Sequence, residues 1–130
     1  MYVAKFQSGN SFLGGAKLSG DWQDKKITAS TQAFLQISPG ETNPNDCLGF
    51  NEVRALPKTF VQIFDGFQCK IPKVTAETGS LIEFEGTAGI IQSNGGTIKH
   101  VFSFVDPWYE QLNCTQNAFV TDQSGINKCP

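Results

Sequence analysis

Charged side chains are scarce in this chain, and the basic ones are scattered. Only 17% of the 130 residues are charged, and the formal net charge at pH 7 is −2. Lys25-Lys26 is the only adjacent pair among the ten basic residues. Nucleic acids and anionic membrane surfaces are bound by clustered Lys and Arg side chains, which this sequence does not contain. We therefore expect neither a nucleic-acid partner nor electrostatic attachment to a membrane.

The sequence also has no long apolar segment. A transmembrane helix needs about 18 or more consecutive apolar residues, and no run approaches that length. The first residues, Met1 to Lys5, do not contain the apolar region of a signal peptide. The sequence therefore predicts no membrane span. It fits either an intracellular protein or a mature chain that follows an added Met.

Motifs for catalysis and metal binding are missing as well. His100 is the only histidine, and no GxSxG or CxxC occurs. The paired glycines Gly14-Gly15 and Gly95-Gly96 are not followed by the Lys of a phosphate-binding loop. A metal site needs several Cys, His or carboxylate ligands at suitable spacing. We expect no metal, no cofactor and no enzymatic activity.

The four cysteines, Cys47, Cys69, Cys114 and Cys129, indicate the cellular location. Their even number and the absence of CxxC favour two disulfides, which persist in secreted proteins. Four cysteines allow three connectivities, and the sequence cannot choose among them. The sequence-local scheme, Cys47–Cys69 with Cys114–Cys129, would attach two polar loops to neighbouring strands, and each bond would stabilise the fold by about 3 kcal/mol. We therefore expect a secreted, extracellular mature chain.

Hydrophobic residues are plentiful and point to a folded β-protein. They make up 39% of the chain and include eleven Phe, which is enough for one packed core. At this length, residues 1–130 are expected to form a single domain. The polar surface must depend on Ser, Thr, Asn and Gln because charges are few, a composition common in extracellular β-proteins.

Residues 89–105 have the pattern of a β-hairpin. Apolar residues flank Asn94-Gly95-Gly96, and Asn-Gly accepts the positive φ angles of a tight hairpin turn. Alternation places Lys99 on the solvent face of the returning arm. The core face of that arm carries the opposite set, Ile98, His100, Phe102 and Phe104.

Alternating segments elsewhere predict further strands, at residues 2–6, 27–37, 59–65, 67–71, 81–85 and 118–121. Residues 27–37 exceed the usual strand length, so this strand should bend to serve two sheets or wrap a barrel. Asp65-Gly66 predicts a second hairpin whose second arm ends at Pro72, and residues 51–56 could form one helical turn. The chain therefore reads as all-β, a small antiparallel β-barrel or sandwich of about seven to nine strands, stapled by two disulfides.

An aromatic loop follows the predicted hairpin and is the main candidate binding site. Trp108 and Tyr109 are adjacent and lie between Asp106 and Glu110. Such rings stack on sugars or anchor protein interfaces, while the carboxylates accept hydrogen bonds. Trp22 is a further aromatic candidate. Alternatively, Trp108 plugs the end of a barrel and Tyr109 bonds to nearby backbone.

Three other features have a functional and a structural interpretation. His100 lies in the apolar register, so we expect a hydrogen-bonded interior histidine rather than a catalytic one. Glu83 and Glu85 point to one side of a strand, where paired carboxylates can hydrolyse glycosides, or simply keep a sheet face wet. Asn113-Cys114-Thr115 fits the N-glycosylation pattern, but a disulfide at Cys114 would work against its use.

In its size, its four spaced cysteines and its Phe-, Gly- and Asn-rich β pattern, the chain resembles small secreted elicitor or effector proteins of filamentous fungi. Such proteins provoke a hypersensitive response in plants. The resemblance implies a virulence-related β-barrel without known enzymatic activity that is sensed by plant defence. It assigns no functional residues.

Three hypotheses follow from the sequence. The first is a secreted non-enzymatic protein that acts by surface recognition of a host protein or a cell-surface glycan, in its specific form an elicitor. The second is a carbohydrate-binding, lectin-like domain that uses Trp108, Tyr109 and Trp22. The third is a small hydrolase that uses Glu83 and Glu85. The sequence leaves the oligomeric state open.

Overall fold

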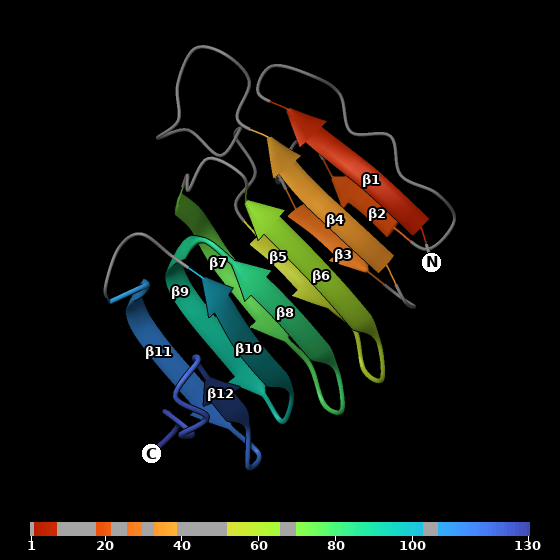
Figure 1. Ribbon diagram of the computed structural model, residues 1–130. Helices are drawn as coiled ribbons and strands as arrows, with labels where there is room; N and C mark the ends of the chain where they lie inside the picture. Colours follow the sequence, from red (N-terminus) through yellow and green to blue (C-terminus); the bar gives the residue numbers. More distant parts are fainter. Residues whose placement is uncertain are drawn as a thin grey trace.

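The computed structural model describes residues 2–7, 18–21, 26–29, 33–38, 52–65, 70–102 and 107–130. Within these ranges the strands form two sheets, which lie as two layers in Figure 1. Sheet A has the order β1 (Tyr2–Gln7), β4 (Ala33–Ser38), β6 (Phe60–Asp65), β8 (Leu81–Glu85), β10 (Thr97–Phe102) and β12 (Phe119–Thr121). Sheet B has the order β11 (Tyr109–Thr115), β9 (Thr87–Asn94), β7 (Lys70–Ala76), β5 (Glu52–Ala55), β3 (Lys26–Ala29) and β2 (Leu18–Asp21).

From β3 onward, successive strands alternate between the two sheets. Each strand therefore pairs with a strand of the next coil, and all eight strands from β5 to β12 pair in parallel. Only β2 and β3 pair antiparallel among the described strands. The described part is thus a two-sheet parallel β-solenoid. The all-β expectation is retained, but the predicted antiparallel barrel or sandwich is wrong.

The predicted hairpin at Asn94-Gly95 is also wrong, although its turn chemistry is present. Gly95 has a φ of +82°, as the Asn-Gly pattern suggested. The chain reverses there, but β9 lies in sheet B and β10 in sheet A, so the two strands face each other instead of sharing hydrogen bonds. The Gly95 amide donates to Thr115 O at 2.8 Å, and Gly95 O accepts from the Gly79 amide at 3.1 Å. The turns therefore bond to the turns of neighbouring coils.

Other sequence expectations are also wrong. β6 and β7 lie in different sheets, so Asp65-Gly66 does not join a hairpin. Pro72 lies inside β7 rather than at its end, and residues 52–55 form the strand β5 instead of a helical turn. The expected single strand at residues 27–37 is instead parts of two strands, β3 in sheet B and β4 in sheet A, so this segment does serve two sheets.

The interior is built from matching levels of apolar side chains. The pairing registers align one row of fully buried residues across sheet A, Val61, Ile82, Ile98 and Val120. A second buried row crosses sheet B opposite it, Val53, Val74 and Ile91. Burial of each such side chain stabilises the fold by about 1.5–3 kcal/mol. Alternation sends every second side chain of a strand inward, so the core faces predicted for β8 and for Ile98 and His100 are confirmed.

The C-terminal residues close one end of the solenoid. The Lys128 amide donates to Val120 O at 2.6 Å, and Asn127 Oδ1 accepts from the Val120 amide at 3.0 Å. These bonds cover the free edge of β12. A disulfide joins Cys114 of β11 to Cys129, with a Cα–Cα distance of 5.8 Å. This pairing belongs to the sequence-local scheme, one of the three connectivities that the sequence left open. It is the one disulfide within the described residues, and Cys47 and Cys69 lie outside them.

No part of the chain that the structure describes forms a helix long and apolar enough to cross a bilayer.

Candidate functional site

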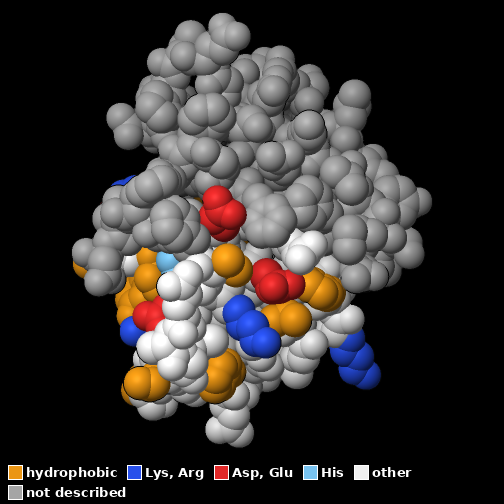
Figure 2. Space-filling model, viewed as in Figure 1, with side chains coloured by type: hydrophobic (Ala, Val, Ile, Leu, Met, Phe, Trp, Pro, Cys, Tyr) orange, Lys and Arg blue, Asp and Glu red, His pale blue; other side chains and the backbone are white. Residues whose placement is uncertain are grey.

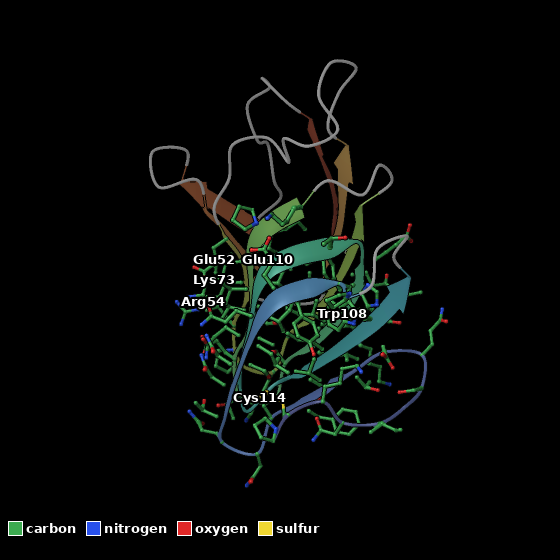
Figure 3. The ribbon with its side chains drawn as sticks, turned by 90° about the vertical axis from the view of Figure 1, so that its left-hand side faces the viewer. Glu52, Arg54, Lys73, Trp108, Glu110 and Cys114 are labelled. Atoms are coloured by element: carbon green, nitrogen blue, oxygen red, sulfur yellow. A yellow bond between two sulfur atoms is a disulfide. The ribbon has the colours of Figure 1, made fainter. Side chains whose placement is uncertain are left out.

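Trp108, the leading binding candidate, lies in the protein interior. Its side chain is only 3% exposed and points into the space between the sheets (Figure 3). The indole stacks on the His100 ring, with a centroid distance of 4.0 Å and an interplanar angle of 3°. Phe84 packs edge-on against it at 6.1 Å. The indole face is therefore covered by protein and is not presented to a sugar ring.

The neighbours of Trp108 point to different places. Tyr109 is half-buried and contacts the indole edge-on at 4.9 Å. Glu110 is exposed and forms an ion pair with Lys70 of β7, which lies two strands away across β9. Asp106 and Trp22 lie outside the described residues. The described part of the predicted aromatic loop is thus divided between the core and the surface.

His100 holds a bend in the chain. The side chain is 7% exposed, and its Nε2 lies 2.8 Å from Gly86 O. Because a carbonyl only accepts, Nε2 carries the proton of this bond. Gly86 is the single residue between β8 and β9, and its φ of +129° is available mainly to glycine. The ring thus supports the point at which the chain crosses between sheets, as expected for an interior histidine.

Glu83 and Glu85 lie on the outer face of sheet A, as predicted. Both side chains are half-exposed, and Glu83 Oε1 accepts from Gln62 Nε2 at 3.1 Å. Lys99 pairs with Glu83 in the strand register, so a cation stands beside this carboxylate. The arrangement matches the structural interpretation, in which the carboxylates belong to a wet sheet face.

The same face carries a row of apolar side chains that the sequence did not reveal. In the registers, Phe60 pairs with Leu81, Leu81 with Thr97, and Thr97 with Phe119. We call Phe60, Leu81 and Phe119, with Thr97 between them, the apolar row. Phe119 is 37% exposed, and Val101 on the same face is 38% exposed. Figure 2 shows apolar side chains among charged ones on this side of the molecule.

The outer face of sheet B is different, because its polar side chains bind one another. Arg54 Nε donates to Glu77 Oε1 at 3.1 Å, and Asn94 Nδ2 donates to the same oxygen at 3.3 Å. Asn94 Oδ1 in turn accepts from Gln92 Nε2 at 2.7 Å and from Thr115 Oγ1 at 3.1 Å. We call these five residues the polar ladder. The ladder connects the coils of β5, β7, β9 and β11.

Two further charged side chains on sheet B, Glu52 and Lys73, are also paired. Glu52 Oε2 accepts from Thr75 Oγ1 at 2.6 Å and lies 3.9 Å from Lys73 Nζ. Figure 3 shows Glu52, Arg54 and Lys73 together on this side of the molecule. The hydrogen-bonding capacity of this face is therefore used largely within the protein.

Within the described ranges, no three His, Cys, Asp or Glu side chains are grouped so that they could hold a metal ion. Comparison of the chain with models of known families, with curated proteins and with solved structures finds no match.

The apolar row was missed because its members are far apart in the sequence. Each of Phe60, Leu81 and Phe119 begins a strand and occupies an ordinary outward position in it. Only the parallel registers bring the three to one level of sheet A. The alternation in residues 81–85 did indicate which side chains point outward, but not which side chains of other strands become their neighbours.

Proposed function

We propose that this protein is a secreted, non-enzymatic domain that recognises a partner protein through the outer face of sheet A. The observation that carries the proposal is the apolar row. It crosses four adjacent strands that are about 4.8 Å apart, so its side chains form one strip. Protein-binding surfaces combine such an apolar centre with a polar rim.

The residues around the apolar row supply that rim. Gln62, Glu83 and Lys99 occupy the next outward level of the same strands. Lys99 and Val101 are exposed, and Gln62 and Glu83 are half-exposed. A partner that covers the row would remove Phe119 and Val101 from water, which stabilises a complex in proportion to the apolar area buried. Sheet B offers a partner fewer groups to bind, because the side chains of its polar ladder already hydrogen-bond to one another.

The buried position of Trp108 argues against the stacking platform that the carbohydrate-binding hypothesis required. For the hydrolase hypothesis, Glu83 and Glu85 stand on a wet sheet face, side by side on one strand. Neither alternative therefore gains support from the described residues.

The specific form of the proposal, a plant host protein as partner, rests on the resemblance to fungal elicitors. The test is infiltration of purified protein into leaves, with electrolyte leakage as the measure of cell death. The key variant is Phe119→Ser combined with Leu81→Ser, which makes the apolar row polar. The control is Gln111→Ala, an exposed position on sheet B.

We expect the wild type and the control to trigger leakage and the sheet A variant to lose at least ten-fold in potency while its circular dichroism spectrum is unchanged. No response to the wild type would remove the elicitor form of the proposal. A full response to the folded sheet A variant would move the recognition surface away from the apolar row.

A further inference from the structure

Asn113-Cys114-Thr115 is the only Asn-x-Ser/Thr sequence in the chain. The difficulty with this motif is its middle residue, because Cys114 forms the disulfide with Cys129. The structure shows how both features can coexist. Along β11, successive side chains point to opposite faces of sheet B. Cys114 packs against the core, whereas Asn113 and Thr115 face outward.

The outward side chain of Asn113 is suited to modification. Asn113 is half-exposed, and its Oδ1 accepts from Gln111 Nε2 at 3.2 Å. That bond leaves the amide nitrogen Nδ2, the atom that would carry a glycan, without a hydrogen bond to any described residue. Thr115, whose hydroxyl completes the recognition motif, is exposed.

We propose that Asn113 is an N-glycosylation site, and that its glycan lies on the outer face of β11. The donor is a polyprenyl-diphosphate oligosaccharide of the secretory pathway. Asn113 Nδ2 forms a bond to the anomeric carbon of the first sugar, and the bond from that carbon to the diphosphate oxygen breaks. The lipid diphosphate leaves with the electron pair, and Nδ2 gives one proton to a base of the transferase.

The position of β11 gives the glycan a structural purpose. β11 is the outermost strand of sheet B, and β12 is the outermost strand of sheet A at the same end. Asn127 and Lys128 bond to β12, and no described residue pairs with the outer side of β11. An open edge strand is a template for pairing with another chain. A bulky hydrophilic group at Asn113 hinders that approach.

The inference uses the secretion that is part of the proposed function, but not the recognition surface on sheet A. The experiment therefore supplies secretion directly, by expression behind a signal peptide in a eukaryotic host. Intact mass before and after treatment with peptide N-glycosidase measures the glycan. Thr115→Ala removes the recognised hydroxyl, Thr115→Ser keeps it, and Asn113→Gln removes the acceptor.

We expect wild type and Thr115→Ser to lose the mass of one glycan on treatment, and Asn113→Gln and Thr115→Ala to show no change. Secreted, disulfide-bonded wild type without a glycan would overturn the proposal. So would a glycan that appears only in Cys129→Ala, because the disulfide would then prevent modification of the native chain. A failure here leaves the leaf assay of the sheet A variant unaffected.

The protective purpose has its own measurement, which is the oligomeric state by light scattering. Glycosylated wild type should remain monomeric at concentrations where Asn113→Gln associates. If both proteins have the same oligomeric state, the glycan does not protect the edge of β11. The mass measurement separately shows whether Asn113 carries a glycan.

Discussion

The two sheets share one interior, but their outer faces differ in the side chains that they expose. On sheet B the outward side chains bind one another from coil to coil, through Arg54, Glu77 and Asn94. On sheet A the corresponding level holds the apolar row, and the outward side chains of the described residues share one hydrogen bond, from Gln62 to Glu83. A face whose polar side chains hydrogen-bond to one another stabilises the fold. A face with exposed apolar side chains can instead bind a partner that covers them.

Substitutions in the interior should reduce the free energy of unfolding most, and by similar amounts in the two sheets. Phe84 of sheet A and Ile91 of sheet B are both fully buried. We expect Phe84→Ala to reduce the free energy of unfolding by about 3–5 kcal/mol and Ile91→Ala by about 2–5 kcal/mol, because each leaves a cavity. Chemical denaturation provides the measurement. A loss below 1 kcal/mol for only one of them would show that the sheets contribute unequally.

The turn that joins the sheets should respond almost as strongly. A Cβ at Gly96 would lie 2.7 Å from both Ala76 Cβ and Glu77 O, and 2.8 Å from Ser80 Oγ. Gly96→Ala should therefore overpack this corner and destabilise the fold by about 1–3 kcal/mol. Thr97→Ala, one residue later and facing outward, is the matched control and should remain within about 0.5 kcal/mol. Equal stability of the two variants would mean that the turns can move apart freely.

The contrast between the outer faces is tested by Asn94→Ala and Lys99→Ala. Asn94 connects Glu77, Gln92 and Thr115 on sheet B, whereas Lys99 is exposed on sheet A. We expect Asn94→Ala to lower the melting temperature, with a loss of about 1–2 kcal/mol, because its partners are left incompletely bonded. Lys99→Ala should change stability by less than about 0.5 kcal/mol. Similar losses of stability in the two variants would mean that the outer faces do not differ in how much they stabilise the fold.

Acid should produce the smallest effect, at the covered edge of sheet A. Hydrogen bonds from Ser124, together with Lys128 at 3.1 Å, hold the pKa of Asp122 well below its usual value. A carboxyl with a lowered pKa stabilises the fold above about pH 4 and loses that contribution as the pH falls. The C-terminal residues should therefore loosen from β12 in acid before the sheets unfold.

This loosening can be followed by NMR as the chemical shifts of Val120 and Lys128 between pH 7 and pH 2. In Asp122→Asn the acid-dependent step should disappear, because the residue no longer titrates. A step of unchanged size in that variant would assign it to another group.

Side-chain direction and the location of several strands could be predicted from this sequence, but β5, β11 and the strand pairing could not. The alternation in residues 81–85 and at Ile98 and His100 correctly identified buried and outward positions. Alternation has a period of two in any sheet, so it carries no information on the partner strand. A turn with positive φ at Gly95 fits a hairpin, and it also fits a crossing between two sheets. Local turn chemistry therefore pointed to the wrong neighbour.

The solenoid left no repeat in the sequence because its coils differ in length. The aligned core residues Val61, Ile82, Ile98 and Val120 are separated by 21, 16 and 22 residues along the chain. Unequal spacing hides the repetition that would have indicated a solenoid.

The position of Trp108 could not be predicted from the sequence for a similar reason. The burial of Trp108 against His100 depends on β8, β10 and the start of β11 meeting in the interior.

The alternation of strands between the sheets has a consequence for cooperativity. Because each strand pairs only with the coil before it and the coil after it, the molecule is close to a one-dimensional stack. Its stability is then a sum of nearest-neighbour terms, and an end coil can detach while the centre persists. The bond between Cys114 and Cys129 acts against this fraying, since it joins the last strand of sheet B to the residues that close sheet A. Opening that bond should make unfolding progressive, beginning at β12.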